Sequence, residues 1–410
     1  RVFIKEDKPT DRDSFKYKRI EVTGELIYLL FREYYSLQQK NIDLTIQREY
    51  EYNATGTGTY KEMDFTNLIE RNINLIFSKK IVEDGFKRAF KGNWGAHAHT
   101  KRLGVLQDLN RLSYFSFICH LRKVNVPIGG DSAKIIPPRL LHGTQWGLQC
   151  PIHTPDGGNV GLHKHLSIFT YISTFCSGYP FISWFRERGL QLIEESSPKN
   201  LSLSTKVFIN GAWIGVINEP QNICKTFKLH RRNGLMPISA SIAWNIRKRE
   251  IHIGTDGGRP MRPIYFINDN MISWDKDLIK KSSFGNLTWN HMIMGLGKKT
   301  RVIPIHNCQI YRIEDVYNFQ GDQEQFLLQN QSIVEYLDTY EEGESFIAIY
   351  SKNMIENKTT HVEIHPSLIL GIMANQIIFP ENNPLPRDLF SCGQAKQAVS
   401  LYNSNYQNRM

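Results

Sequence analysis

One stretch, residues 92–169, constrains the fold and the partners of this 410-residue chain more than any other. It is basic, rich in Gly, Pro and His, and almost free of acidic residues. From Phe86 to His165 there are eleven Lys or Arg residues against three Asp, a net charge of +8 out of +10 for the whole chain. A charge concentrated in this way predicts a localised basic surface with an anionic partner, rather than an evenly basic protein.

Within this stretch we expect two glycine- and proline-rich loops that flank one helix. The spacing of Leu106, Leu109 and Leu112 predicts a helix over residues 103–123. Residues 125–138 contain two glycines and three prolines and predict a loop, and turns continue over residues 143–161. Because glycine lets a backbone approach sugar and phosphate closely, this arrangement suits the lining of a nucleic-acid groove.

The flanking segments predict mixed helices and strands. Helices are expected over residues 22–39, which Thr23 would cap, over 65–79, which Thr66 would cap, and over 218–234, 286–294 and the end of the chain. Strands are expected over 206–218, 249–267 and 345–351, with a hairpin turn at Asn210–Gly211. The fold class is therefore α+β and multidomain, with mixed helical and antiparallel β modules. A further, structural reading is that residues 174–360, which have an acidic patch at 335–344 and lack basic loops, form a docking surface for other subunits.

Several other classes of protein and site are disfavoured. The chain contains no run of about 18 apolar residues, so no membrane span is expected. Six scattered cysteines without a CxxC pair argue against a zinc ribbon or a disulfide framework and favour a reducing compartment. The pairs His97/His99 and His163/His165 each lack a close third ligand, so no metal site is predicted. The residues alone thus indicate nucleic-acid binding of low sequence preference, or phosphate handling, and no reaction.

A long resemblance narrows this reading. NRLSYFSFICHLRKVNVPI (110–128) and PPRLLHGTQWGLQCPIHTPDGGNVGLHKHLS (137–167) resemble the fork region of the second-largest, beta-type subunit of multisubunit DNA-dependent RNA polymerases. Segments before and after resemble other parts of that subunit in the same order. PDGGNVGLHKH is similar to versions in large DNA viruses. The resemblance implies five regions: the end of the protrusion (1–91), the fork (92–173), external 1 (174–270), external 2 (271–361) and the start of the hybrid-binding region (362–410).

The resemblance also implies roles for individual residues. Contacts with the incoming nucleotide fall on Arg387, Arg139 and Asp156. Contacts with nucleic acid fall on Lys101, Arg102, Arg122, Lys134, Lys396 and Gln397. The sequence departs from the family pattern at Asp156, where Glu is usual, and at Asp388, where Asn is common. No catalytic residue is expected in this chain, because the aspartates that bind the catalytic Mg²⁺ belong to the largest subunit. The family's zinc site is expected outside this chain, which we read as a piece of a longer one.

The implied function is that of one part of the catalytic core of a DNA-directed RNA polymerase, a nucleotidyltransferase, inactive as an isolated chain. Its partners would be the largest subunit, smaller polymerase subunits, the DNA template, the nascent RNA and ribonucleoside triphosphates, with no membrane. The location would be intracellular: the nucleus for a cellular enzyme, the virion or the host cytoplasm for a viral one. The alternative is a non-catalytic basic module for nucleic-acid binding or subunit docking.

Overall fold

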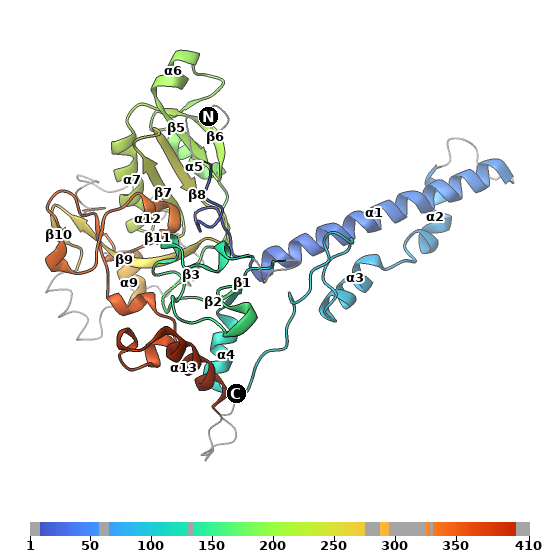
Figure 1. Ribbon diagram of the computed structural model, residues 1–410. Coiled ribbons are helices and arrows are strands. Elements are labelled where there is room, and N and C mark those ends of the chain that lie inside the picture. The colour runs from blue at the N-terminus through green and yellow to red at the C-terminus, as the bar shows by residue number, and fades with distance from the viewer. Residues whose placement is uncertain are drawn as a thin grey trace. The chain divides into compact units, whose positions relative to one another are not determined.

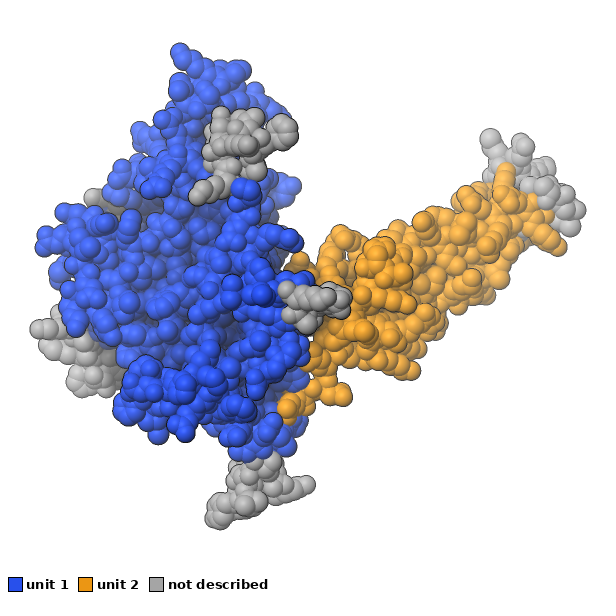
Figure 2. Space-filling view, viewed as in Figure 1, with its two compact units in different colours: residues 1–20, 111–410 blue, residues 21–110 orange. Residues whose placement is uncertain are grey.

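The computed structural model (Figure 1) describes residues 9–56, 65–128, 135–274, 288–294, 325, 327–328 and 331–398. The chain divides into two compact units, which are residues 21–110 and residues 1–20 together with 111–410 (Figure 2). Both contain helices, and the second also contains the β-sheets, so the predicted α+β class is confirmed. None of the described helices combines the length and the apolar character that a membrane-spanning helix needs.

The unit formed by residues 21–110 is helical. The long helix α1 (Thr23–Gly56) packs against α2 (Phe65–Ile76) and α3 (Ile81–Phe90) (Figure 1). Leu30 and Tyr34 of α1 are buried with Ala89 and Trp94. The first two helices were predicted, but α1 continues well past residue 39. Neither threonine lies outside its helix as a cap, because Thr23 is the first residue of α1 and Thr66 lies inside α2.

The long helix predicted over residues 103–123 is wrong in its first half. The structure has only α4 (Tyr114–Leu121), which begins where the side chain of Ser113 accepts a hydrogen bond from the Ser116 amide. Leu103, Leu106, Leu109 and Leu112 precede this helix and are exposed. Helices in proteins depend mainly on a packed apolar face. The leucine spacing was helical, but these side chains are not buried against a core.

A five-stranded sheet carries the largest apolar core of the other unit. Its order is β4-β6-β5-β8-β7, with β5 and β8 parallel and the other pairs antiparallel. Helices α5 and α7 lie beside this sheet (Figure 1). They bury Phe185 and Phe227 in its core. The predicted hairpin is confirmed, since Asn210 and Gly211 both have positive φ, as its tight turn requires. The bounds are β4 Gln191–Leu192, β5 Thr205–Ile209, β6 Ala212–Ile217, β7 Ser241–Asn245, β8 Glu250–Gly254, α5 Tyr179–Arg186, α6 Pro198–Leu203 and α7 Pro220–Arg232.

A second sheet is built around the buried strand β9. Antiparallel partners β11, β13, β10 and β3 pair with β9, and β12 pairs in parallel with β13. The predicted strand over 345–351 shortens to the two residues of β12, whereas the predicted final helix is present as α13. The bounds are β3 Tyr171–Ile172, β9 Pro260–Asn268, β10 Met271–Ile272, β11 Val334–Asp338, β12 Ile347–Ala348, β13 His361–Val362, α9 Trp289–Met294, α12 Thr339–Gly343 and α13 Leu385–Gln397.

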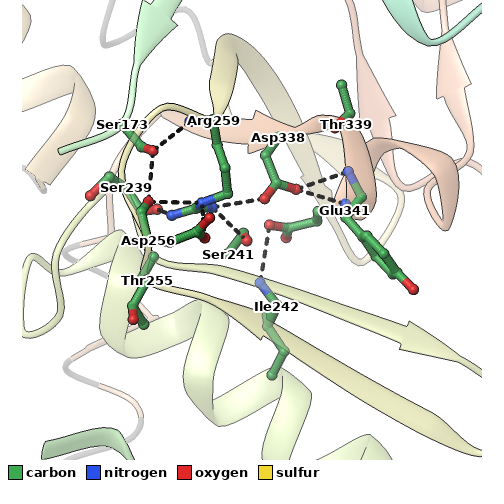
Figure 3. Close-up of polar contacts among 12 residues, drawn as sticks. Ser173, Ser239, Ser241, Ile242, Thr255, Asp256, Arg259, Asp338, Thr339 and Glu341 are labelled. Atoms are coloured by element: carbon green, nitrogen blue, oxygen red, sulfur yellow. Dashed lines mark hydrogen bonds and ion pairs between the residues drawn. The ribbon is translucent and has the colours of Figure 1, made fainter. Parts of the chain in front are cut away.

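The acidic patch 335–344 gives little support to the docking reading of residues 174–360, which stays a prediction. Glu335 and Glu341 are buried, and both accept hydrogen bonds from Arg231 of α7, at 2.9 and 2.7 Å. Asp338 is also buried. It accepts from the Arg259 guanidinium at 2.7 Å and caps α12 by accepting from the Glu341 amide at 2.8 Å (Figure 3). These carboxylates are internal ion-pair partners, so they present little negative charge to another protein.

The pKa values agree with this internal pairing. Burial disfavours the Glu335 carboxylate, but Arg232, the hydrogen bond from His361 and Arg231 outweigh it and hold the pKa of Glu335 well below its usual value. Burial likewise opposes the charge of Arg231, yet Glu341 and Glu335 raise its pKa. Arg231 and Glu335 are therefore both charged in the folded chain, and loss of Arg231 would leave two buried carboxylates with one cation fewer to balance them.

The first prediction concerns this pair. Arg231→Met should lower the free energy of unfolding by about 3–5 kcal/mol, because it removes the guanidinium that both buried carboxylates share and leaves Glu335 to Arg232 and Glu341 to the more distant Lys228. The control is Arg186→Met, since Arg186 pairs with Glu195 on the surface, where the side chains are 52% and 48% exposed. That change should cost about 0–1 kcal/mol. Chemical denaturation measures both, and equal costs would contradict an essential buried pair.

Candidate functional site

The part of the basic stretch that lies in the larger unit, residues 111–169, contains a small two-stranded sheet. Strands β1 (Lys123–Asn125) and β2 (His163–His165) pair antiparallel, and α4 leads directly into β1. Arg122 joins helix and strand, and its Nη2 donates to the carbonyls of Ser167 at 2.6 Å and Ile168 at 3.3 Å. Burial lowers the pKa of Arg122. Its guanidinium therefore holds the chain together internally, and its predicted contact with nucleic acid stays a prediction.

Arg139 and Asp156 are brought to one pair of facing turns. Arg139 ends the short 3₁₀ helix η2 (Pro137–Arg139) and donates through Nη1 to the carbonyls of Gly158 at 2.8 Å and Val160 at 2.9 Å. Asp156 caps another 3₁₀ helix, η4 (Gly157–Asn159), by accepting from the Gly157 amide at 2.9 Å. The carboxylate itself is exposed. The guanidinium thus fixes the turn that carries the carboxylate.

Gly161 makes this close approach possible. Its φ is +72°, which L side chains rarely adopt, and a Cβ there would lie 2.3 Å from the Arg139 carbonyl oxygen. A glycine is therefore required both by the backbone conformation and by the neighbouring chain.

Helix α13 carries three of the predicted contact residues at its two ends. Arg387 lies in the first turn and is exposed, whereas its neighbour Asp388 is buried. Lys396 and Gln397 lie in the last turn, nine and ten residues later. At about 1.5 Å and about 100° per residue, Arg387 and Lys396 are roughly 14 Å apart along the axis and on opposite sides of the helix. They cannot contact the same group.

Lys396 lies beside a buried group of histidines and thiols. The rings of His153 and His165 stack at 3.6 Å between centroids and 5° between planes, and Cys119 and Cys392 are buried close by. His165 Nδ1 lies 3.1 Å from the Cys119 carbonyl oxygen, which can only accept, so Nδ1 carries the proton. Burial lowers the pKa of Lys396.

Both imidazoles of the stack are neutral. Burial, followed by the charge of Lys396, lowers the pKa of His153 to about 3. Burial, then His153 and Lys396, lowers the pKa of His165 to about 2. Sequence reasoning had paired His165 with His163 as candidate metal ligands. It missed His153, which comes ten residues before His163 and gave no spacing signal.

The remaining predicted contacts lie elsewhere. Lys101 and Arg102 belong to the unit of residues 21–110, where Lys101 is exposed and Arg102 forms an ion pair with Glu21 at 2.7 Å. Lys134 lies outside the described residues. The structure thus groups Arg139 with Asp156 and places Arg387, Lys396 and Gln397 on one helix.

The donor set in the described residues does not fit a magnesium or zinc ion. Within the described ranges, no three or more His, Cys, Asp or Glu side chains are placed to hold a metal together. The exposed carboxylate of Asp156 stands alone in its loop, and Asp388 points into the protein interior. A single exposed carboxylate can add one ligand to an ion held elsewhere, but it does not form a metal site by itself.

Comparisons with known proteins give the family. Two family descriptions match, "RNA polymerase Rpb2, domain 3" over residues 107–172 and "RNA polymerase Rpb2, domain 4" over residues 207–268. The DNA-directed RNA polymerase II subunit RPB2 of Encephalitozoon cuniculi is 33% identical over 98% of this chain and 32% of its own length. This chain belongs to the Rpb2 family of RNA polymerase second subunits.

Other relatives come from a cellular organism and from a virus. Subunit 2 of DNA-directed RNA polymerase II from Arabidopsis thaliana is 32% identical over 98% of this chain and 31% of its own length. DNA-directed RNA polymerase subunit 2 of Acanthamoeba polyphaga mimivirus is 27% identical over 97% of this chain and 32% of its own length. The chain therefore spans about a third of the length of the curated relatives it matches. The five-region division within it stays a prediction.

The second prediction tests the turn that holds Arg139. Gly161→Ala should lower the free energy of unfolding by about 2–4 kcal/mol, because the new Cβ meets the Arg139 backbone and the φ is strained. Gly158→Ala is the matched control, since a Cβ there meets nothing within 4 Å. Denaturation of both variants gives the comparison. If Gly161→Ala is as stable as Gly158→Ala, the close approach is not required.

The third prediction follows from the neutral histidine stack. The folded-state pKa values of His153 and His165 lie below the ordinary value near 6.5, so the unfolded chain takes up protons first as the pH falls. The contribution of the two neutral histidines to the free energy of unfolding is therefore fully present above about pH 6.5 and is lost as the pH falls towards about 3. When the pH is lowered from about 7.5 to about 5.5, the free energy of unfolding of His153→Gln should fall by about 1.4 kcal/mol less than that of the unsubstituted chain. Identical losses in urea denaturation would contradict a neutral buried His153.

Proposed function

We propose that this chain is part of the catalytic core of a DNA-dependent RNA polymerase and lines its active-centre cleft. In this proposal it contacts the RNA–DNA hybrid, the downstream edge of the bubble and the incoming nucleotide. Two properties support it: the family match extends over almost the whole chain, and the excess positive charge is concentrated in the fork stretch. Contacts of this kind bind phosphate and sugar without reading bases.

The observation that carries the proposal is the state of Arg387. Its side chain is exposed on the first turn of α13, and no hydrogen bond or ion pair joins its guanidinium to another residue within the described part of the chain. Arg102, Arg122, Arg231 and Arg259 are in contrast all engaged. A guanidinium left open at a helix end can bind two triphosphate oxygens at once, which a lysine ammonium cannot do in the same geometry.

Arg139 and Asp156 are proposed to act beside the nucleotide. The guanidinium of Arg139 donates to the carbonyls of Ile135, Gly158 and Val160, and the last two contacts keep the Asp156 turn in one conformation. This leaves the Asp156 carboxylate exposed in a defined position, where it can accept hydrogen bonds from a ribose or from a metal-bound water. Its side chain is one methylene shorter than the glutamate usual in the family, so its reach is correspondingly smaller.

The hybrid contacts are proposed for Lys101, Arg102, Lys396 and Gln397, and Lys134 would act at the downstream edge of the bubble. Lys101 and Gln397 are exposed, and Lys396 is half-buried with an aliphatic stem that packs and an ammonium that can reach a phosphate. Arg102 would have to exchange Glu21, a surface partner, for a phosphate. Such surface pairs are weak, so the exchange costs little.

The partners follow from what this chain does not supply. Phosphoryl transfer depends on positioning and on neutralising charge, and the Mg²⁺ ions that do much of the neutralising would be held by the largest subunit. Smaller polymerase subunits, template DNA, nascent RNA and ribonucleoside triphosphates complete the assembly. The location is proposed to be that of the assembled polymerase, the nucleus in a cell or the virion or host cytoplasm for a virus.

The fourth prediction tests Arg387 in the assembled enzyme. Arg387→Ala should raise the apparent KM for ribonucleotides by about 10- to 100-fold, since it removes a charge-assisted, bidentate contact. The KM of Arg387→Lys should lie between those of the unsubstituted and alanine enzymes, because lysine keeps the positive charge but cannot make the bidentate contact. The control is Arg247→Ala, which removes another exposed arginine, in the turn between β7 and β8. Steady-state incorporation on a primed template gives the KM. An unchanged KM in a normally assembled Arg387→Ala enzyme would refute the role.

A further inference from the structure

One hydroxyl joins the beginning of α4 to the end of α13. Ser113 Oγ accepts from the Ser116 amide at 3.1 Å, which caps α4, and donates to the carbonyl oxygen of Lys396 at 3.0 Å. Ser113 and Lys396 are 283 positions apart in the chain. A serine hydroxyl has one hydrogen to donate and lone pairs to accept, so one side chain can do both.

The two helix ends need this hydroxyl for complementary reasons. The first amides of α4 lack partners within the helix, and Ser113 satisfies one of them. The last carbonyls of α13 also lack donors within their helix, and Ser113 supplies a donor to the one at Lys396. The hydrogen bond therefore holds the backbone of Lys396 itself, and not a neighbouring turn.

Side-chain packing below this hydrogen bond keeps the two helices in register. Cys119 of α4 and Cys392 of α13 are buried together with Met373, and Ala395 packs against them. Cys392 is one turn before Lys396, so the buried face of α13 leads directly to the lysine. At its other end α4 is fixed by Arg122 and by the hydrogen bond from His165 to the Cys119 carbonyl. Helix α4 is thus a fixed support for the end of α13.

From this geometry we infer that Ser113 is a positioning residue, which holds the Lys396 side chain in place for its contact with a phosphate of the RNA–DNA hybrid. The inference rests on the proposed function of Lys396. Ser113 touches neither substrate nor nucleic acid in it. Ser113 acts only through its hydrogen bond to the Lys396 backbone. In this way α4 would influence how tightly the end of α13 binds the hybrid.

The test uses the assembled polymerase on an RNA–DNA scaffold, with the dissociation rate of the elongation complex measured over a range of KCl concentrations. Ser113→Ala should shorten the lifetime about threefold to tenfold, and Lys396→Met should shorten it at least as much. Both should flatten the slope of log lifetime against log salt by about one, because each loses one phosphate contact. A loss of stability alone would leave that slope unchanged.

Further variants separate the hydrogen bond from folding. Ser113→Thr keeps the hydroxyl and should stay within about twofold of the unsubstituted enzyme. Ser113→Gly keeps most of the stability of the helix start but has no hydroxyl, so it should behave like Ser113→Ala even if the alanine variant assembles poorly. Ser197→Ala removes a comparable cap from α6. Since no hydrogen bond among the described residues joins Ser197 to α13, this variant should change neither lifetime nor slope.

The double variant decides between the possible failures. In the Lys396→Met background, Ser113→Ala should add no further loss, because the contact it positions is already gone. Full additivity there, or an unchanged lifetime and slope in Ser113→Ala and Ser113→Gly, would overturn the positioning role while leaving the role of Lys396 intact. A normal lifetime and slope in Lys396→Met would instead overturn the proposed function of that lysine, and the inference with it.

Discussion

The larger unit depends on the double ion pair that Arg231 makes with Glu335 and Glu341. Arg231 lies on the helix that covers the five-stranded sheet, and its partners lie on and next to a strand of the other sheet. A buried guanidinium is tolerated only when its partners are placed to satisfy it. Hydrophobic packing allows some sliding between layers, but two charged hydrogen bonds of fixed geometry do not. The pair therefore fixes the spacing of the two sheets.

Local sequence signals predicted the elements whose stability is local. The hairpin at Asn210–Gly211 and the strands on either side of it were predictable because the turn and the alternation lie within a few residues. The leucines of residues 103–112 misled, since helical spacing says nothing about whether a packing partner exists. The acidic segment misled for a similar reason. Its charges are balanced by arginines about a hundred residues away, and composition within a window cannot contain them.

The residues of the candidate site likewise fall into those that a local motif indicates and those that depend on distant contacts. Arg387 and Asp156 could be named from the family resemblance, because they stand within recognisable motifs. The hydrogen bonds of Arg122 to carbonyls some 45 residues away could not be predicted from the sequence. The stacking of His153 on His165 could not be predicted either. Ser113 lies in a recognisable motif too, but gave no sign of its link to Lys396. Such contacts arise only when distant segments meet, and a single sequence does not encode them in any spacing.

The placement of Arg387 and Lys396 on one helix has a mechanical consequence. A helix of thirteen residues without proline in its interior behaves as a stiff rod, so its two ends move together. If the nucleotide is held at one end and the duplex at the other, a shift of the rod along its axis displaces both by the same distance. The proposed nucleotide and hybrid contacts would then be mechanically coupled, and the hydrogen bond from Ser113 to Lys396 would carry α4 along with them.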